Sequence, residues 1–336
     1  MATKKTKAKP SGQDAPLLTQ KERRTINAMV ELGQKDPQGI QNALVSRALT
    51  LCPLPYRKPK ESQLVRQTKL PIGSLCVAFS DMTVSKQLAY GDDALLLDLL
   101  ASEARRRGER VIAFKTAQDL LVFAGIRPDA AGNFGGNLFK LILQRVERLR
   151  RLGIAVHWNE PDGRMGPLNI YRVFSRSYTP SATDSEREAF GEHALFPYFL
   201  EFSEEFFEEL MSHYRAIPRD VLLNFQGNPT EYAIAKWIVD RVQTARSVST
   251  VSLEALRDER GSGDSNLRRY KQQVYNVLVK LSAWKADFHP DHGSVARLTP
   301  KGLRIGPMQD TLPVENPPKQ GVSHRKSPYA FSGGLP

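Results

Sequence analysis

Cysteine is nearly absent from this chain of 336 residues, which contains two. Cys52 and Cys76 are too few for a disulfide framework or a zinc site, so both are expected to be free thiols. No run approaches the roughly 18 apolar residues of a membrane span. No apolar segment follows the Lys-rich N-terminus, as a secretory signal would require. These absences predict a cytoplasmic protein with no membrane partner.

The motifs of nucleotide-driven and strand-cutting enzymes are also missing. No Gly-x-x-x-x-Gly-Lys-Ser/Thr sequence occurs, which argues against a P-loop ATPase. A rolling-circle nickase would need a nucleophilic tyrosine and a metal held by histidines. His289 and His292 have the nearest spacing, without a third ligand nearby, and Tyr270 and Tyr275 are better explained by packing or phosphate contacts. We therefore expect a non-enzymatic protein with no catalytic residue, metal or cofactor.

Positive charge, in contrast, is abundant. The chain has 48 Lys and Arg against 36 Asp and Glu, a net charge of +12, and its isoelectric point is about 9.7. For a chain without membrane segments, this balance points to a polyanionic partner, most simply nucleic acid. Hydrophobic residues make up 40% of the chain, enough for real cores, and the length suits two or three domains.

The stretch 137–153 has the pattern of one amphipathic helix. Its apolar residues recur at steps of three and four: Leu138, Leu141, Ile142, Val146, Leu149 and Leu152. Its opposite face carries long polar side chains: Lys140, Gln144, Arg148 and Arg151. Gly153 follows, where a left-handed C-cap is expected. Such a cationic helix suits the DNA major groove, which is about 12 Å wide. Taken alone, a solvated surface helix remains the alternative.

The neighbouring segments favour the DNA-binding interpretation. The predicted order is a helix at 93–106, a strand at 111–114, a helix at 116–124, a Gly-rich turn at 125–136, the helix at 137–153 and a β-hairpin at 154–175. Arg164, Arg172 and Arg176 make the hairpin basic. This is the order of a winged helix, in which the third helix is the recognition helix.

The same order of elements recurs in the second half of the chain. Asn228 and Pro229 predict the start of a helix. The following elements are a strand at 249–251, a helix at 252–258, a turn at 261–263, a helix at 266–284 and a hairpin that turns at 289–293 and returns at 295–298. Because element order is repeated and residues are not, this is weaker than a sequence repeat.

The long helix at 266–284 has the better face for reading bases. Its apolar stripe comprises Leu267, Tyr270, Val274, Val277 or Leu278, Leu281 and Trp284. Its polar residues are Arg268, Arg269, Gln272, Gln273, Asn276 and Lys280. Arg pairs with guanine, and Gln or Asn with adenine, through two hydrogen bonds worth about 1–3 kcal/mol of discrimination. We predict that this helix reads bases, and that the helix at 137–153, together with Arg164, adds DNA contacts that depend less on base sequence.

Scattered residues and the overall layout resemble the iteron-binding plasmid replication initiators, the RepA and TrfA-like group. The resemblance covers roughly 74–307. The residues that carry it are Gly-Asp-Asp-Ala-Leu-Leu at 91–96, Val-Glu-Arg-Leu-Arg-Arg-Leu-Gly at 146–153, Ile-Pro-Arg-Asp at 217–220, Ala-Ile-Ala-Lys-Trp at 233–237 and Leu-Thr-Pro-Lys-Gly-Leu at 298–303. It implies an α+β fold of two tandem winged-helix domains with a flexible basic N-terminal region.

This resemblance also implies a function. Its members bind direct repeats in double-stranded plasmid origin DNA, open the duplex with a host replication initiator and helicase, and repress their own genes as dimers. A homodimer in equilibrium with monomer is therefore expected, with dimer contacts in the first domain and repeat reading in the second. A winged-helix transcriptional repressor is the main alternative, and a rolling-circle nicking enzyme is a weaker one.

Composition divides the chain into five parts. The N-terminus is rich in lysine, and proline is frequent near the C-terminus, so both ends are expected to be disordered. The predicted parts are a basic, partly disordered N-terminal extension at 1–70, a first winged-helix domain at 71–176, a linker at 177–193, a second winged-helix domain at 194–305 and a Pro-rich tail at 306–336.

Overall fold

The computed structural model describes residues 19–35, 40–61, 63–69, 73–83, 87–159, 164–178, 198–260 and 266–308. Within these ranges the chain has a mixed α and β fold in which every strand pair is antiparallel. The Lys-rich N-terminus, most of the predicted linker and most of the Pro-rich tail lie outside the described residues.

The order of elements predicted for both halves is present in the structure. The helices are α1 (Gln20–Gln34), α2 (Arg47–Leu51), α3 (Asp93–Arg107), α4 (Ala117–Phe123), α5 (Gly136–Arg150), α7 (Glu204–Ser212), α8 (Arg219–Leu223), α9 (Pro229–Thr244), α10 (Leu253–Arg260), α11 (Leu267–Trp284) and the 3-10 helix η3 (Ala286–Phe288). The strands are β1 (Asn42–Ser46), β2 (Gln63–Lys69), β3 (Ser74–Asp81), β4 (Val111–Phe114), β5 (Leu152–Asn159), β6 (Met165–Arg172), β7 (Phe174–Tyr178), β8 (Tyr198–Phe202), β9 (Tyr214–Pro218), β10 (Ser249–Val251), β11 (Ala296–Thr299) and β12 (Gly302–Ile305).

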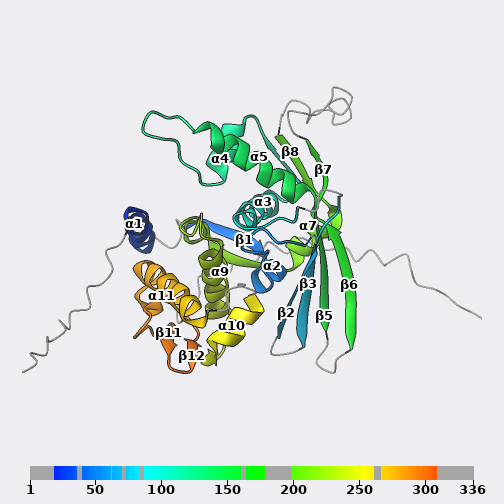
Figure 1. Cartoon of the computed structure of the whole chain (residues 1–336). Helices are drawn as coiled ribbons and strands as arrows, with labels where there is room; N and C mark the ends of the chain where they lie inside the picture. The colour runs from blue at the N-terminus through cyan, green and yellow to red at the C-terminus, as the bar shows by residue number, and fades with distance from the viewer. Residues whose placement is uncertain are drawn as a thin grey trace, which may run out of the picture.

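The strands of the described residues form four small sheets. Figure 1 shows β2, β3, β5 and β6 at one side of the molecule and β1 among the helices in its middle. The largest has the order β2-β3-β5-β6. The others are β4-β8-β7, β10-β12-β11 and the pair β1-β9. In the C-terminal half, β10 follows α9 and pairs with β12, the second strand of the hairpin β11–β12. In the N-terminal half, β4 pairs with β8 instead.

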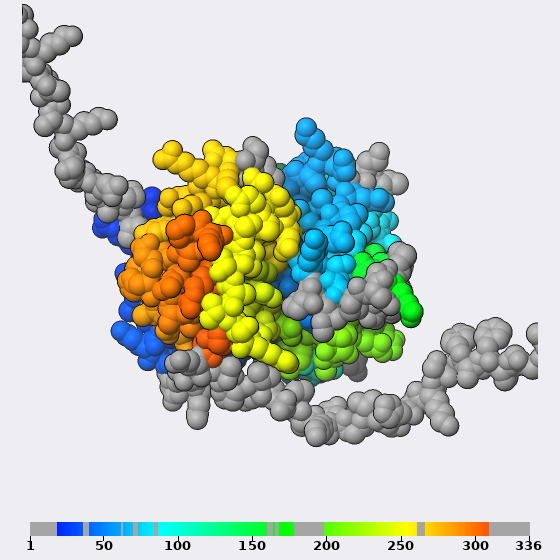
Figure 2. All heavy atoms as spheres, turned by 90° about the horizontal axis from the view of Figure 1, so that it is seen from below, coloured from blue at the N-terminus to red at the C-terminus, as the bar shows by residue number. Residues whose placement is uncertain are grey.

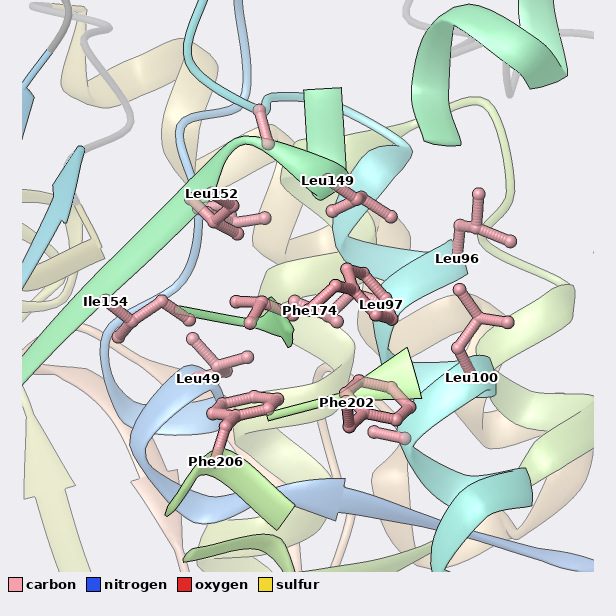
Figure 3. Close-up of a cluster of buried hydrophobic side chains, with 14 of the residues drawn as sticks. Leu49, Leu96, Leu97, Leu100, Leu149, Leu152, Ile154, Phe174, Phe202 and Phe206 are labelled. Carbon is pink, nitrogen blue, oxygen red and sulfur yellow. The ribbon is translucent and has the colours of Figure 1, made fainter. Parts of the chain in front are cut away.

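Two hydrophobic cores fill the molecule, and α3 belongs to both. Leu96, Leu97 and Leu100 point into the first core, whereas Leu95 and Leu99 belong to the second. A helix that is apolar on nearly all sides is typical of a buried position. Figure 3 shows the first core, in which α3 meets leucine and phenylalanine side chains from α2, α5, β5, β7, β8 and α7. The near-continuous apolar sequence of α3 is therefore explained by its place between two cores.

Residues 20–69, expected as an extension, contribute to both cores. Met29 and Leu32 of α1 and Val45 of β1 are buried in the second core, and Leu49 of α2 is buried in the first. Within this predicted extension, the segment 38–51 contains β1 followed by α2, and the segment 52–70 contains β2. The partners of β1 and β2 are β9 and β3. These segments are strands because they pair with other strands, and the periodicity of their own residues does not reveal that pairing.

Two predicted glycine-containing boundaries are wrong. The helix at 137–153 ends at Arg150, and Gly153 lies in β5 rather than in a left-handed C-cap. A Cβ atom at Gly153 would lie 2.7 Å from the sulfur of Met82, an exposed and flexible side chain that would have to move. The last hairpin turns between Thr299 and Gly302, where Gly302 has φ of +133°, and not at His289. Residues 286–288 form η3 before that hairpin.

The two halves meet through a buried polar cluster between α3 and α9. The Nζ atom of Lys236 donates to Oδ2 of Asp98 at 2.6 Å, and the hydroxyl of Tyr232 donates to the same oxygen. All three side chains are buried. Farther out, Thr68 of β2 donates to the carboxylate of Glu259 of α10 at 3.1 Å. Figure 2 shows yellow residues of the C-terminal half beside light-blue residues of the N-terminal half. The halves are thus joined between α3 and α9 and between β2 and α10.

Candidate nucleic-acid interface

The helix α11 is built as an amphipathic helix with a defined start. Asn266 is its N-cap, and its side chain accepts a hydrogen bond from the backbone N–H of Arg269 at 3.2 Å. The predicted stripe is buried: Tyr270, Val274, Val277, Leu278, Leu281 and Trp284 all lie in the second core. This packing fixes which face of the helix is turned outward.

The helix α1 covers the C-terminal half of α11. Met29 and Leu32 of α1 share the core with α11, and Gly33 lies so close that an added Cβ atom would be 2.4 Å from the backbone oxygen of Trp284. Lys280 acts electrostatically on Glu22 of α1, whose pKa is lowered chiefly by hydrogen bonds from Thr19. The surface of α11 that remains open is therefore its N-terminal half.

The open half of α11 carries most of the predicted base-reading residues. Arg268, Arg269 and Gln272 are exposed, as is Lys271 beside them. Gln273 and Asn276 are half-buried, and Asn276 accepts a hydrogen bond from the side-chain amide of Gln272 at 2.9 Å. Residues 267–276 extend over roughly 15 Å at about 1.5 Å per residue. This length is comparable with the width of a major groove, about 12 Å.

Lys280 lies apart from this surface. Its Nζ atom is 2.5 Å from the carboxylate of Glu231 on α9, and the two side chains are 13% and 6% exposed. The ion pair joins α11 to α9 beneath α1. As the side chain lies, Lys280 supports the packing of the helix and is not offered to a ligand at the open half.

A short basic hairpin follows α11. β11 and β12 place Arg297 directly opposite Arg304, and Lys301 is exposed at the turn between the strands. Arg304 also donates to the backbone oxygen of Ser294 at 3.1 Å. Sequence reasoning did not name these residues or Lys271 as candidates. The Thr-Pro-Lys-Gly sequence at 299–302 was the available signal, since Pro and Gly mark turns.

The predicted binding face of α5 is largely occupied by ion pairs within the protein. Arg148 makes a two-pronged contact with Asp93 of α3, at 2.7 Å and 2.8 Å, and its guanidinium lies over the ring of Tyr90. Burial raises the pKa of Asp93, against the opposing effect of Arg148. Arg145 pairs with Asp92 at 2.8 Å. These arginines attach α5 to the start of α3.

The remaining candidates of the N-terminal half differ in exposure. Lys140 and Gln144 are exposed on α5, and Arg164 is exposed just before β6. Arg151, after the last turn of α5, pairs with Glu147 and is 26% exposed. The structure therefore places Lys140 and Gln144 together on one exposed face of α5. Arg148 and Arg151 are not available in the same way, because they pair with Asp93 and Glu147.

The residues considered for catalysis are placed as packing residues or turns. Tyr270 is buried in the second core, where burial raises the pKa of its phenol, and Tyr275 is half-buried. The rings of His289 and His292 stack at 3.6 Å between centroids. Within the described ranges, no group of three or more His, Cys, Asp or Glu side chains is arranged to hold a metal ion. None of the described helices is long and apolar enough to cross a lipid bilayer.

Comparison with known proteins finds distant structural likeness alone. No model of a protein family matches the sequence, and no curated protein matches it. A solved structure of a selenomethionine derivative of domains 2 and 3 of RctB is similar to this chain with a TM-score of 0.47 and 16% identity, over 70% of this chain and 82% of that one. A second structure of RctB domains 2 and 3 is similar with a TM-score of 0.42 and 15% identity, over 69% and 82% of the two chains.

Proposed function

We propose that this chain is a DNA-binding replication initiator with two winged-helix units, which recognises direct repeats at a plasmid origin. The observation that carries the proposal is the open N-terminal half of α11, with Arg268, Arg269 and Gln272 exposed on one helix. The helix belongs to a unit in the order α9, β10, α10, α11, β11, β12, with the sheet order β10-β12-β11. This order and pairing suit a winged helix with α11 as its recognition helix.

The position of the exposed residues along α11 supports base reading. Recognition helices of this class contact base edges mainly through their N-terminal residues. Here α1 closes off the C-terminal half, while the hairpin β11–β12 presents Lys301 at its turn. Arg269 and Gln272 are residue types that pair with guanine and adenine through two hydrogen bonds. We infer that α11 enters the major groove and that Lys301 contacts the adjacent phosphates.

In the proposed initiator, the N-terminal half supplies weaker DNA contacts and the dimer contacts. Lys140 and Gln144 are exposed for phosphate contact. On the outer face of the largest sheet, Val65, Ala78, Ala155 and Ile170 follow one another across the four strands in register. Val65 is 63% and Ile170 66% exposed, and Leu168 beside them is 58% exposed. Exposed apolar residues in a row favour a protein partner, here a second copy of the chain.

The dimer contact is tested by replacing Ile170 with Asp. The exposed position should tolerate the charge in the monomer, whereas a face between two copies would bury it unpaired. Sedimentation of the full chain should then show monomer at concentrations where the parent protein is dimeric. Val122→Asp provides a matched control at an exposed apolar position on α4. Equal self-association of all three proteins would remove this sheet face from the proposal.

The proposed initiation needs no catalytic residue of the chain. Energy for opening would come from binding, because several copies on adjacent repeats bend the duplex and lower the cost of unstacking A·T-rich DNA nearby. Host replication initiator and helicase would then load on the opened strands. Purified protein, without ATP or divalent metal, should make an origin plasmid reactive to a single-strand probe, with host initiator added if required. A site-specific nick carrying covalently attached protein would overturn this mechanism in favour of a nicking enzyme.

The recognition role of α11 is tested by replacing Arg269 with Ala. Loss of a two-pronged base contact should cost about 1–3 kcal/mol on the cognate repeat and relax one base position. The measurement is competition binding against a library of single-base variants of the repeat. Arg107→Ala, at an exposed ion-paired arginine of α3, is the matched control and should bind as the parent does. A larger loss of specificity from Lys140→Ala than from Arg269→Ala would reverse the roles of the two units.

A transcriptional repressor would use the same exposed helix and the same dimer face. The two roles differ in the DNA sites they require. Direct repeats spaced by about two DNA turns beside the gene favour initiation, whereas a lone inverted repeat favours a two-fold symmetric repressor. Footprinting on the DNA that flanks the gene distinguishes them. Repression of its own promoter by the initiator is compatible with both site types being present.

A further inference from the structure

A basic hollow lies at the end of α5 that faces away from Lys140. It is bounded by the last turn of α5, by the junction of β6 and β7, and by the residues that follow β3. Its volume is about 360 Å³. Its wall includes Glu147, Arg150, Arg151, Arg172, Arg176 and Ser177. We call it the arginine hollow.

The charge of the arginine hollow is strongly positive. Four arginines line it against the carboxylate of Glu147, and Glu201 beside the wall offsets one of them, Arg176, so the remaining charge is 3 − 1 = +2. The C-terminal end of a helix carries roughly −0.5 charge, which the arginines outweigh. A hollow lined by one sign of charge concentrates its field and attracts a ligand of the opposite sign.

The guanidinium groups of the arginine hollow are held in place by neighbouring groups. Glu147 contacts both Arg150, at 2.7 Å, and Arg151. The Nε atom of Arg150 also donates to the hydroxyl of Ser177 at 2.5 Å. Arg176 pairs with Glu201 of β8 at 2.5 Å. Because one carboxylate serves two arginines, their remaining N–H groups keep donor capacity for an anion.

The size and the residue type indicate the class of anion. Small-molecule pockets in proteins have volumes of about 300–1,000 Å³, and the arginine hollow is at the lower end of this range. Arginine binds phosphate through paired, charge-assisted hydrogen bonds, and several such donors suit several phosphate oxygens. Arg150 and Arg151 are 34% and 26% exposed, so water screens them less than surface side chains.

We propose that the arginine hollow is a binding site for phosphate groups, separate from the α11 surface. The chemistry is shared by two sources: a compact polyphosphate such as pyrophosphate or a nucleoside triphosphate, and the phosphates of the DNA backbone. A hollow of about 360 Å³ accommodates one small molecule, whereas a duplex presents its phosphates along an extended line. The hollow is therefore assigned first to a compact polyphosphate. Its existence does not depend on the role of α11.

The experiment is calorimetric titration of the full chain at constant ionic strength with pyrophosphate, with metal-free ATP and with a random 30-base-pair duplex. Arg172→Gln removes an exposed arginine of the wall and should weaken pyrophosphate binding about tenfold, the effect of one charge-assisted hydrogen bond. Glu147→Gln removes the opposing charge and should tighten binding several-fold. Arg107→Gln changes net charge as Arg172→Gln does, far from the hollow, and should leave binding unchanged.

The outcomes separate the phosphate source and the proposed function. If Arg172→Gln weakens pyrophosphate and ATP but leaves duplex binding unchanged, the site takes a compact polyphosphate. If it weakens the duplex equally and pyrophosphate competes with duplex, the phosphates are those of DNA. Arg269→Ala should affect the duplex and leave pyrophosphate unchanged, so failure of the α11 proposal is visible independently. Absence of millimolar pyrophosphate binding, or equal binding by the Arg172, Glu147 and Arg107 variants, would overturn the site.

Discussion

The helices α5 and α11 look alike in sequence and use their basic residues differently. Both are amphipathic, and both carry arginines on the face opposite an apolar stripe. On α5, Arg145 and Arg148 bind the carboxylates of Asp92 and Asp93. On α11, Arg268 and Arg269 are exposed. The comparison teaches that the number of cations on a helix face does not indicate DNA contact, because acids on neighbouring elements decide which cations face outward.

The largest effect is expected for stability, from replacing Arg148 with Ala. Asp93 is fully buried, so its carboxylate would lose its partner at a cost of about 3–5 kcal/mol. Chemical unfolding of the variant should show this loss. Arg269→Ala should change the free energy of unfolding by about 0.5 kcal/mol or less, as is usual for exposed residues. Equal effects of the two substitutions would contradict the assignment of a structural role to Arg148 on α5 and of a surface position to Arg269 on α11.

The cover formed by α1 on α11 should be sensitive to a single methyl group. In Gly33→Ala the new Cβ atom would lie 2.4 Å from the backbone oxygen of Trp284, so one helix must move. Overpacking of this kind typically costs about 1–3 kcal/mol. Unfolding measurements test the cost, and proteolysis within α1 reports the displacement. Gly108→Ala, at a position with open space but φ of +70°, is the control for backbone strain without contact with α11.

A smaller effect is expected on the salt dependence of DNA binding, in which exposed arginines and lysines of α5 and α11 should differ from ion-paired ones. The affinity for any duplex should fall linearly on logarithmic axes of affinity and salt concentration. Replacing Arg268 or Lys140 with Ala should each reduce the slope by about one, since each removes one phosphate contact. Arg145→Ala should leave the slope unchanged, because Arg145 is paired with Asp92. A flat salt dependence for the parent protein would remove nucleic acid as the main partner.

The smallest expected effect is a difference in the reactivity of the two cysteine thiols. Cys52 is buried in the first core, and burial raises the pKa of its thiol to about 12. Cys76 is half-buried on the outer face of the largest sheet, in register with Gln67 and His157. A thiol reagent should therefore modify Cys76 in the native protein and both cysteines after unfolding. Native labelling of Cys52 would show that the region around α2 opens readily.

Local patterns in the sequence predicted the elements and their faces. The stripe of α11 and the helix start at Asn228 and Pro229 are confirmed. These features depend on residues three or four positions apart, so sequence reports them directly. The pairing of β1 with β9 and of β4 with β8, and the ion pair of Arg148, depend on residues far apart in the chain. A single sequence does not show which distant residues are close in space, so these pairs were not predicted. For the same reason, too many basic residues of α5 were expected to be available for DNA.

The position of α3 has a consequence for how the chain can be divided. One side of α3 packs into the second core through Leu95 and Leu99. The other side packs into the first core through Leu96, Leu97 and Leu100. A fragment that starts near residue 194 would lack these two leucines and the buried part of α1, and would expose an apolar surface to water. Melting of the intact chain should accordingly proceed as one cooperative transition. We therefore expect the two halves to fold as one unit, because α3 belongs to both cores.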